Sequence, residues 1–191
     1  MNDSKHPTKP DVDDHLVETQ IESRQVWSGK LLDVRSDRVR LPDGTEATRE
    51  YIVHPGAAMI IPVLPNGDLV MERQFRYPTG RVMIEFPAGK LDPGEDMLVT
   101  AQRELLEETG YRAAKWELLA EVHPIVSYTT EVIEIFLATG LTLERAQLDP
   151  GEFLEVFTIP VAEAYALLKA GEIVDLKTMV GLYQLRERGF A

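Results

Sequence analysis

The stretch at residues 89–111, GKLDPGEDMLVTAQRELLEETGY, constrains the fold of this chain more than any other part of it. Residues four apart lie above one another on one side of an α-helix, so Glu104 and Glu108 share a face. Glu107 falls between them and Arg103 lies beside them. An apolar stripe adjoins this face and is made of Leu98, Ala101 and Leu105. The pattern predicts a helix that packs one side against a core and gathers carboxylates next to that side.

This concentration of negative charge needs a compensating partner. Like charges four residues apart cost an isolated helix about 0.2–0.5 kcal/mol per pair. Carboxylate oxygens are hard ligands that suit Mg²⁺ or Mn²⁺. One interpretation is therefore a divalent cation bound at this face, and the other is a solvated helix face without a ligand.

The full spacing of the stretch resembles the Nudix box. That pattern has a Gly, five residues, a Glu, seven residues, then Arg-Glu, an aliphatic residue, any residue, Glu-Glu, any residue, Gly and an aliphatic residue. The residues that match in register are Gly89, Glu95, Arg103, Glu104, Leu105, Glu107, Glu108 and Gly110. Tyr111 departs from the pattern because it is aromatic where an aliphatic residue is usual.

The resemblance implies an α/β fold, the Nudix α/β/α sandwich with a mixed sheet, in which the box forms a loop, a helix and a loop. It also implies that Glu104, Glu108 and the backbone carbonyl of Ala88 bind Mg²⁺, with Mn²⁺ as the other candidate. Glu107 would bind the metal or support the residues that do. Arg103 and Glu95 would orient the box carboxylates.

The rest of the chain divides into three parts. Residues 1–20 are polar and predict a flexible tail. Residues 21–54 predict a small β appendage, and residues 55–191 predict the catalytic domain. The expected strands are 25–27, 31–41, 49–53, 57–64, 69–76, 82–87, 117–122, 131–138 and 153–159, and the expected closing helices are 160–171 and 176–188. Asn66-Gly67 predicts a hairpin between 57–64 and 69–76 within the core sheet.

Three further segments, at residues 39–50, 73–76 (RQFR) and 85–89 (EFPAG), resemble the ADP-ribose pyrophosphatase branch, which acts on nucleoside diphosphate sugars. The resemblance implies an intertwined homodimer in which the appendage of one subunit helps to line the nucleoside pocket of the other. Leu31 and Arg49 match those pocket positions, and Arg76 and Glu85 match positions that contact the diphosphate and the terminal sugar. Without the resemblance, Leu31 would be interpreted as a core residue and Arg49 as a surface cation.

The stretch GEFLEV at residues 151–156 resembles the acidic loop and strand that bring a further glutamate to the site in this family. Glu152 is the first candidate because a loop residue can swing over bound substrate to bind a metal or the attacking water, and Glu155 is the alternative. The branch often has a Pro-Gly turn where this chain has Ser-Tyr-Thr-Thr-Glu at residues 127–131. Glu131 therefore either touches the substrate or begins a strand, and the preferred sugar stays open.

Charge and composition exclude several classes of protein. The chain has 191 residues, with 20 Lys plus Arg against 32 Asp plus Glu and a formal net charge of −12, which argues against a general nucleic-acid footprint. It has no cysteine, so neither a disulfide framework nor a thiolate zinc site is expected. No apolar run reaches membrane-spanning length. We expect a cytoplasmic protein without a membrane partner.

The resemblance to the ADP-ribose pyrophosphatase branch also implies a reaction, and the charges are consistent with it. Hydrolysis of a diphosphate needs cations that screen the phosphates and an activated water. The predicted activity is metal-dependent hydrolysis of a nucleoside diphosphate sugar, with ADP-ribose giving AMP and ribose 5-phosphate. The alternatives are a GDP-mannose or ADP-glucose pyrophosphatase, or a Nudix-fold ligand sensor without turnover.

Overall fold

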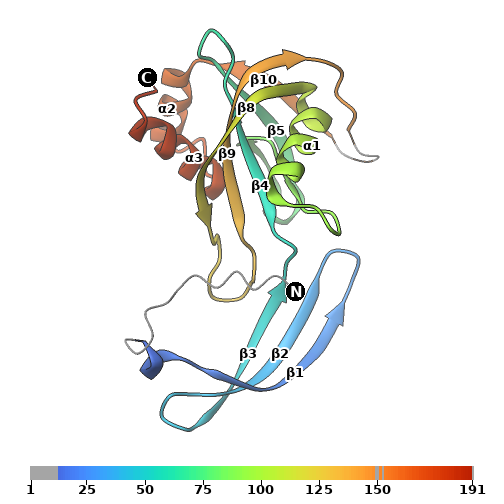
Figure 1. Ribbon diagram of the computed structural model, residues 1–191, viewed down its shortest axis with the longest axis vertical. Coiled ribbons are helices and arrows are strands. Elements are labelled where there is room, and N and C mark those ends of the chain that lie inside the picture. The colour runs from blue at the N-terminus through green and yellow to red at the C-terminus, as the bar shows by residue number, and fades with distance from the viewer. Residues whose placement is uncertain (1–12, 149–150, 152, 191) are drawn as a thin grey trace. The chain divides into compact units, whose positions relative to one another are not determined.

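The computed structural model describes residues 13–148, residue 151 and residues 153–190, which fall into two compact units. The first unit runs to His54 and also contains Ile125–Thr130. The second contains Pro55–Pro124 and continues from Glu131. Each unit has its own sheet structure (Figure 1).

The first unit is built on one antiparallel sheet in the order β1-β2-β3, after a short 3-10 helix, η1. The elements are η1 (Asp14–Leu16), β1 (Thr19–Ser28), β2 (Asp33–Arg40) and β3 (Glu46–Val53). The predicted strand at 31–41 begins only at Asp33, so Leu31 and Leu32 lie in the connection between β1 and β2. The turn after β2 includes Gly44, whose φ of 86° suits glycine.

Ile125–Thr130 joins this sheet through the backbone of β3. The amide of Ile52 donates to the carbonyl of Tyr128 at 2.9 Å, and the amide of Thr130 donates to the carbonyl of Ile52 at 3.0 Å. No local pattern predicts this pairing, because the two segments lie far apart in the chain.

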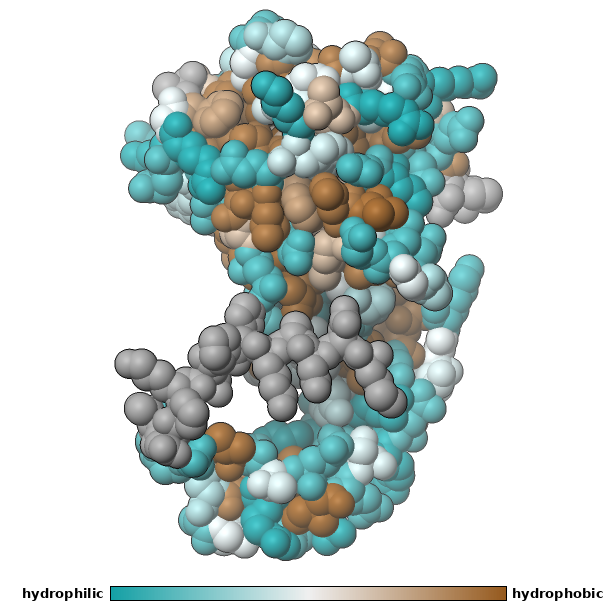
Figure 2. Space-filling model, in the orientation of Figure 1, coloured by the Kyte–Doolittle hydropathy of each residue, from teal (hydrophilic) through white to brown (hydrophobic). Residues whose placement is uncertain are grey.

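A single three-stranded layer cannot cover both of its faces, and this one leaves large apolar side chains exposed. Figure 2 shows hydrophobic side chains among the hydrophilic ones on the surface of both units. In the first unit the exposed apolar residues include Val26, Trp27, Leu31, Leu32 and Val53.

The second unit contains two sheets. The larger has the order β7-β4-β9-β8, with β4 and β9 parallel and the other pairs antiparallel, so it is the mixed sheet that was predicted. Its strands are β4 (Ala57–Pro62), β7 (Ala88–Lys90), β8 (Tyr111–Val122) and β9 (Ile133–Leu143). The smaller is antiparallel in the order β10-β5-β6, with β5 (Leu69–Arg76), η2 (Tyr77–Thr79), β6 (Arg81–Glu85) and β10 (Leu154–Ile159).

The predicted hairpin between 57–64 and 69–76 is wrong, although the turn itself forms. The amide of Leu64 donates to the carbonyl of Asp68 at 2.9 Å, and Gly67 has a φ of 91°. Beyond a single bridge between Val63 and Leu69, however, β4 and β5 enter different sheets. The reason is that β7 and β9 take the two edges of β4, which leaves no edge for β5.

Helices cover both faces of the larger sheet, which confirms the predicted α/β/α arrangement (Figure 1). They are α1 (Met97–Thr109) on one face and α2 (Val161–Ala170) and α3 (Leu176–Glu187) on the other. Strand β4 is buried on both sides, since successive side chains point to opposite faces. Ala58 and Ile60 pack with Ala101 and Leu105 of α1, whereas Met59 and Ile61 pack with Leu182 and Leu185 of α3.

The ends of the helices follow local chemistry. Asp96 caps α1 by accepting from the amide of Val99 at 2.9 Å. Gly110 ends it with a φ of 76°, and a β-carbon at that position would lie 2.8 Å from the amide nitrogen of Ala146. None of the helices in the described part of the chain combines the length and apolar character needed to span a membrane.

Candidate active site

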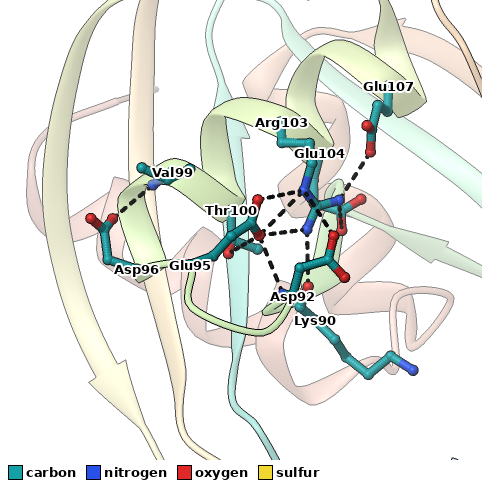
Figure 3. Close-up of polar contacts among 9 residues, drawn as sticks. All are labelled: Lys90, Asp92, Glu95, Asp96, Val99, Thr100, Arg103, Glu104 and Glu107. Atoms are coloured by element: carbon teal, nitrogen blue, oxygen red, sulfur yellow. Dashed lines mark hydrogen bonds and ion pairs between the residues drawn. The ribbon is translucent and has the colours of Figure 1, made fainter. Parts of the chain in front are cut away.

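Arg103, in the middle of α1, is the centre of a hydrogen-bonded cluster (Figure 3). Its guanidinium donates to Glu95 at 2.9–3.3 Å, to Glu104 at 2.8 Å and to Glu107 at 3.0 Å. It also donates to the backbone carbonyl of Lys90 at 3.1 Å, which ties the helix to the end of β7. The structure therefore brings three glutamates of the box together around one arginine.

The cluster shifts the pKa values of its members in opposite directions. The hydrogen bonds from Arg103 lower the pKa of Glu95 to about 2, against the opposing effect of burial. The hydroxyl of Thr100 and the amide of Asp92 also donate to Glu95, at 2.9 and 3.3 Å. The same contact with Glu95 raises the pKa of Arg103. Glu95 is thus an anion that holds Arg103 in place.

The two glutamates expected to bind a metal both pack against residues 88–89. Glu108 is 3% exposed, and its Oε2 accepts a hydrogen bond from the amide of Ala88 at 3.0 Å. Glu104 lies so close to Gly89 that a β-carbon there would be 1.8 Å from Glu104 Oε1. Ala88, Glu104 and Glu108 are therefore brought together, although α1 and β7 are separate elements.

These donors fit a hard divalent cation by their chemistry, because carboxylate and carbonyl oxygens are the ligands that Mg²⁺ prefers. In the described part of the chain, no three acidic or histidine side chains surround a common point that could hold a metal ion. Arg103 lies among the carboxylates instead and donates to both Glu104 and Glu107. A cation bound to Glu104 would share that carboxylate with Arg103.

A second charged cluster joins β5, β6 and α3. Arg76 donates to both carboxylate oxygens of Glu85, at 2.8 and 2.9 Å, and Lys177 donates to Glu85 and to Asp175. Glu85 is 2% exposed. Burial raises the pKa of Glu85, but the hydrogen bonds from Arg76 and Lys177 outweigh it, so the pKa is lowered overall.

Sequence reasoning predicted Arg76 and Glu85 but missed Lys177. The only local feature of the sequence that marks Lys177 is that it follows Asp175 by two residues. Asp175 caps α3 by accepting a hydrogen bond from the amide of Thr178 at 2.9 Å. The hydroxyl of Thr178 accepts from the amide of Phe86 at 3.0 Å. Residues at the start of α3 therefore form hydrogen bonds with residues 85–86. These residues lie just before β7, the strand that contacts Glu104 and Glu108.

The remaining acidic candidates are placed differently. Glu155 lies on β10 with its side chain 69% exposed, and it accepts from Arg73 of β5 at 3.1 Å. Glu152 lies outside the described residues. Glu131 is half-buried and precedes β9, which begins at Ile133, so the alternative that Glu131 begins a strand is wrong.

Leu31 and Arg49 belong to the first unit. Leu31 is 65% exposed, so the interpretation as a core residue is wrong. Arg49 lies on β3 and forms an ion pair with Glu18.

Comparison with known proteins agrees with these features. Residues 53–179 match the model of the NUDIX domain, and residues 18–52 match that of the nucleoside diphosphate sugar hydrolase N-terminal domain. The chain is 38% identical over 173 residues to the ADP-ribose pyrophosphatase of Bacillus subtilis (strain 168), covering 90% of this chain and 94% of the relative.

Two more distant relatives extend the comparison. The chain is 34% identical over 143 residues to the GDP-mannose pyrophosphatase of Cronobacter sakazakii, covering 70% of this chain and 74% of that protein. The fold matches the crystal structure of an ADP compounds hydrolase with a TM-score of 0.80 and 25% identity, over 91% of this chain and 97% of the other. From the complete box, the sandwich fold and these matches, we conclude that the chain belongs to the Nudix family.

Proposed function

We propose that this protein hydrolyses the diphosphate bond of a nucleoside diphosphate sugar in the presence of Mg²⁺, with ADP-ribose as the first substrate and AMP and ribose 5-phosphate as products. The observation that carries the proposal is the packing of Glu104 and Glu108 on residues 88–89, in a chain whose first strands match the N-terminal domain of nucleoside diphosphate sugar hydrolases. The relatives named ADP-ribose pyrophosphatase and ADP compounds hydrolase support the same substrate class.

Mg²⁺ would be held by Glu104, Glu108 and the carbonyl of Ala88, with Glu107 beside them. When bound, the ion supplies charge screening and activation of water. Arg103 has a positioning role: its contacts with Glu95, Glu104 and Glu107 fix where the carboxylates point. Mn²⁺ offers the same coordination chemistry and is the alternative ion.

Arg76 is the residue proposed to bind the diphosphate. Its side chain is 39% exposed, and Glu85 holds the guanidinium through two parallel hydrogen bonds. Both carboxylate oxygens of Glu85 accept from Arg76, and one also accepts from Lys177. We therefore assign Glu85 a positioning role instead of a direct contact with the sugar.

A glutamate is proposed to activate the water. Glu155 is engaged by Arg73 at the surface of the smaller sheet, so Glu152 stays the first candidate. Glu131 is proposed to border the sugar. If Glu152 activates the water, Glu152→Gln should lose turnover and Glu155→Gln should keep full turnover.

The first unit is proposed to form a homodimer, with Leu31 and Arg49 of one subunit reaching the nucleoside of the other. The support is its exposed apolar surface, which one layer of strands cannot cover. Light scattering should show a dimer at assay concentration. Arg49→Ala should raise KM more than it lowers kcat if its contact is equally strong in substrate and transition state. A fully active monomer would contradict the shared pocket.

The proposal as a whole is tested by a panel of nucleoside diphosphate sugars with Mg²⁺ and with Mn²⁺, with the products identified by mass spectrometry. We expect AMP and ribose 5-phosphate from ADP-ribose at the highest kcat/KM. A higher kcat/KM for GDP-mannose or ADP-glucose would keep the chemistry and change the substrate. Release of no nucleoside monophosphate from any member of the panel would favour the ligand sensor.

A further inference from the structure

A cavity of about 670 Å³ opens between α2 and α3, on the opposite face of the larger sheet from α1. Its volume lies within the range of small-molecule sites, which is about 300–1,000 Å³. The lining is mainly apolar and includes Tyr165, Leu168, Tyr183 and Phe190. The box carboxylates are on α1, so this cavity is separate from the proposed site of hydrolysis.

The cavity is shaped by the last residues of the described chain. After α3, Gly189 adopts a φ of 80° and the chain folds back, so that the amide of Phe190 donates to the carbonyl of Leu185 at 3.2 Å. The hydroxyl of Tyr165 on α2 donates to the carbonyl of Phe190 at 3.0 Å. These two hydrogen bonds anchor the segment after α3 to both helices and make it one wall of the cavity.

Two cations, Lys169 and Arg186, line the same cavity. Lys169 follows Tyr165 by four residues on α2, and Arg186 follows Tyr183 by three on α3, so each cation shares a helix face with an aromatic ring of the lining. Burial raises the pKa of the Tyr165 hydroxyl, and the positive charge of Arg186 acts in the opposite direction.

The charged residues that line the cavity are positive, whereas the chain as a whole has a formal net charge of −12. Within residues 13–148 and 153–190, neither Lys169 nor Arg186 forms an ion pair, and no acidic residue lines the cavity. Each cation lies in the last turn of its helix, where the helix dipole favours positive charge. That explanation accounts for one cation at each helix end, but it does not require both to border one apolar cavity.

We propose that this cavity binds a monocarboxylate with an apolar body, of the size of a medium-chain fatty acid. The carboxylate would accept hydrogen bonds from Lys169 and Arg186, and the apolar body would lie against Tyr165, Leu168, Tyr183 and Phe190. Lys169 and Arg186 are exposed, so the carboxylate would lie at the mouth of the cavity and pair with both cations there, while the apolar body would be covered by the wall. The site does not depend on the proposed hydrolysis.

Isothermal titration calorimetry with octanoate as the probe tests the proposal. The wild-type protein should bind one octanoate saturably and should bind neutral octanamide at least tenfold more weakly. The variant Lys169→Gln/Arg186→Gln should also bind octanoate at least tenfold more weakly. The control Lys115→Gln/Arg145→Gln removes two exposed cations outside the cavity and should bind octanoate as the wild type does.

A third variant keeps the charges and fills the space. Ala162 lines the cavity from the first turn of α2, so Ala162→Trp should block octanoate. This variant also decides the matter if Lys169→Gln/Arg186→Gln fails to fold by circular dichroism. Octanoate bound by Ala162→Trp as by the wild type, octanamide bound as tightly as octanoate, an equal loss in the control, or no saturable binding by the wild type would each overturn the proposal.

Discussion

Glu104 lies directly over the backbone of Gly89, in the space that any side chain at position 89 would occupy. A β-carbon on Gly89 would be 1.8 Å from Oε1 and 1.9 Å from Cδ of Glu104, which is far inside contact distance. The glycine of the box is therefore required for a close approach between strand and helix. Because Gly89 has no unusual φ, this requirement concerns space and not backbone conformation.

The first prediction is that Gly89→Ala keeps the fold and loses turnover. The methyl group forces the Glu104 carboxylate to move, and a displacement of about 1 Å at a reacting centre can cost about a hundredfold in rate. The measurement is kcat/KM for ADP-ribose. Lys90→Ala, at the neighbouring and exposed position of β7, is the control and should retain most activity. Similar rates for Gly89→Ala and wild type would remove Glu104 from the site.

The second prediction concerns metal binding at Glu108. Mg²⁺ at about a hundred times its dissociation constant should stabilise the wild-type protein by about 2.7 kcal/mol. Glu108→Gln can still accept from the amide of Ala88 through its side-chain oxygen, so the fold should persist. Without the charge, Mg²⁺ affinity or activity should fall at least roughly ten- to hundredfold. Mutation of residues that only support metal ligands already causes a loss of that size, so loss of a ligand should cause no less.

Thermal unfolding with and without Mg²⁺ checks this second prediction. Glu163→Gln, on the first turn of α2 and away from α1, is a matched control that should keep the full shift. Melting temperatures that do not respond to Mg²⁺ or Mn²⁺, together with full activity in chelator, would exclude the metal site.

The third prediction concerns Lys177, which supplies one of the donors to Glu85. Its side chain is 13% exposed and that of Glu85 is 2% exposed, so solvent cannot replace the lost donor fully. Lys177→Met should lower the free energy of unfolding by about 1–3 kcal/mol, because a buried charged acceptor loses a partner while Arg76 remains. Lys177→Arg should recover part of the loss.

Urea unfolding measures this change, with Lys115→Met as the exposed control, for which we expect a change within about 0.5 kcal/mol. KM for ADP-ribose should rise in Lys177→Met, since Glu85 then holds Arg76 less firmly. Unchanged stability and unchanged KM would contradict the positioning role of Lys177.

The fourth prediction concerns pH. The pKa of Glu95 is lowered from 4.5 to about 2, so below 4.5 the unfolded chain binds a proton that the folded protein does not. The contribution of Glu95 to stability is therefore complete above pH 4.5 and is lost as the pH falls towards 2. Urea unfolding at about pH 6 and about pH 3 should show a smaller difference between wild type and Glu95→Gln at the lower pH. A difference that does not change with pH would contradict the prediction.

Most elements that depend on local patterns were predictable from the sequence. The predicted strand at 69–76 and the two predicted closing helices agree with β5, α2 and α3. The features that define them are local: Gly171 ends α2 and Asp175 caps α3. The box also predicted that Arg103 would lie beside the glutamates of its helix face, and Glu107, four residues on, pairs with it because helix geometry fixes that spacing.

Contacts between distant segments were decided only by the tertiary structure. Lys177 and Glu85 are 92 residues apart, and no local pattern relates them. The three residues of β7 are too few to give a periodic signal, yet β7 takes an edge of β4 and separates β5 from that sheet. Ile125–Thr130 joins β3 for the same reason, because strand edges are filled by whichever segment the whole fold brings near.

The sequence by itself therefore determined the family, the box helix and the set of acidic candidates, because each depends on spacing within one element. The tertiary structure decided that Glu104 needs a bare backbone at Gly89 and that Glu85 is held by both Arg76 and Lys177. Packing between elements is a property of the whole chain, and the short-range periods of helix and strand carry no information about it.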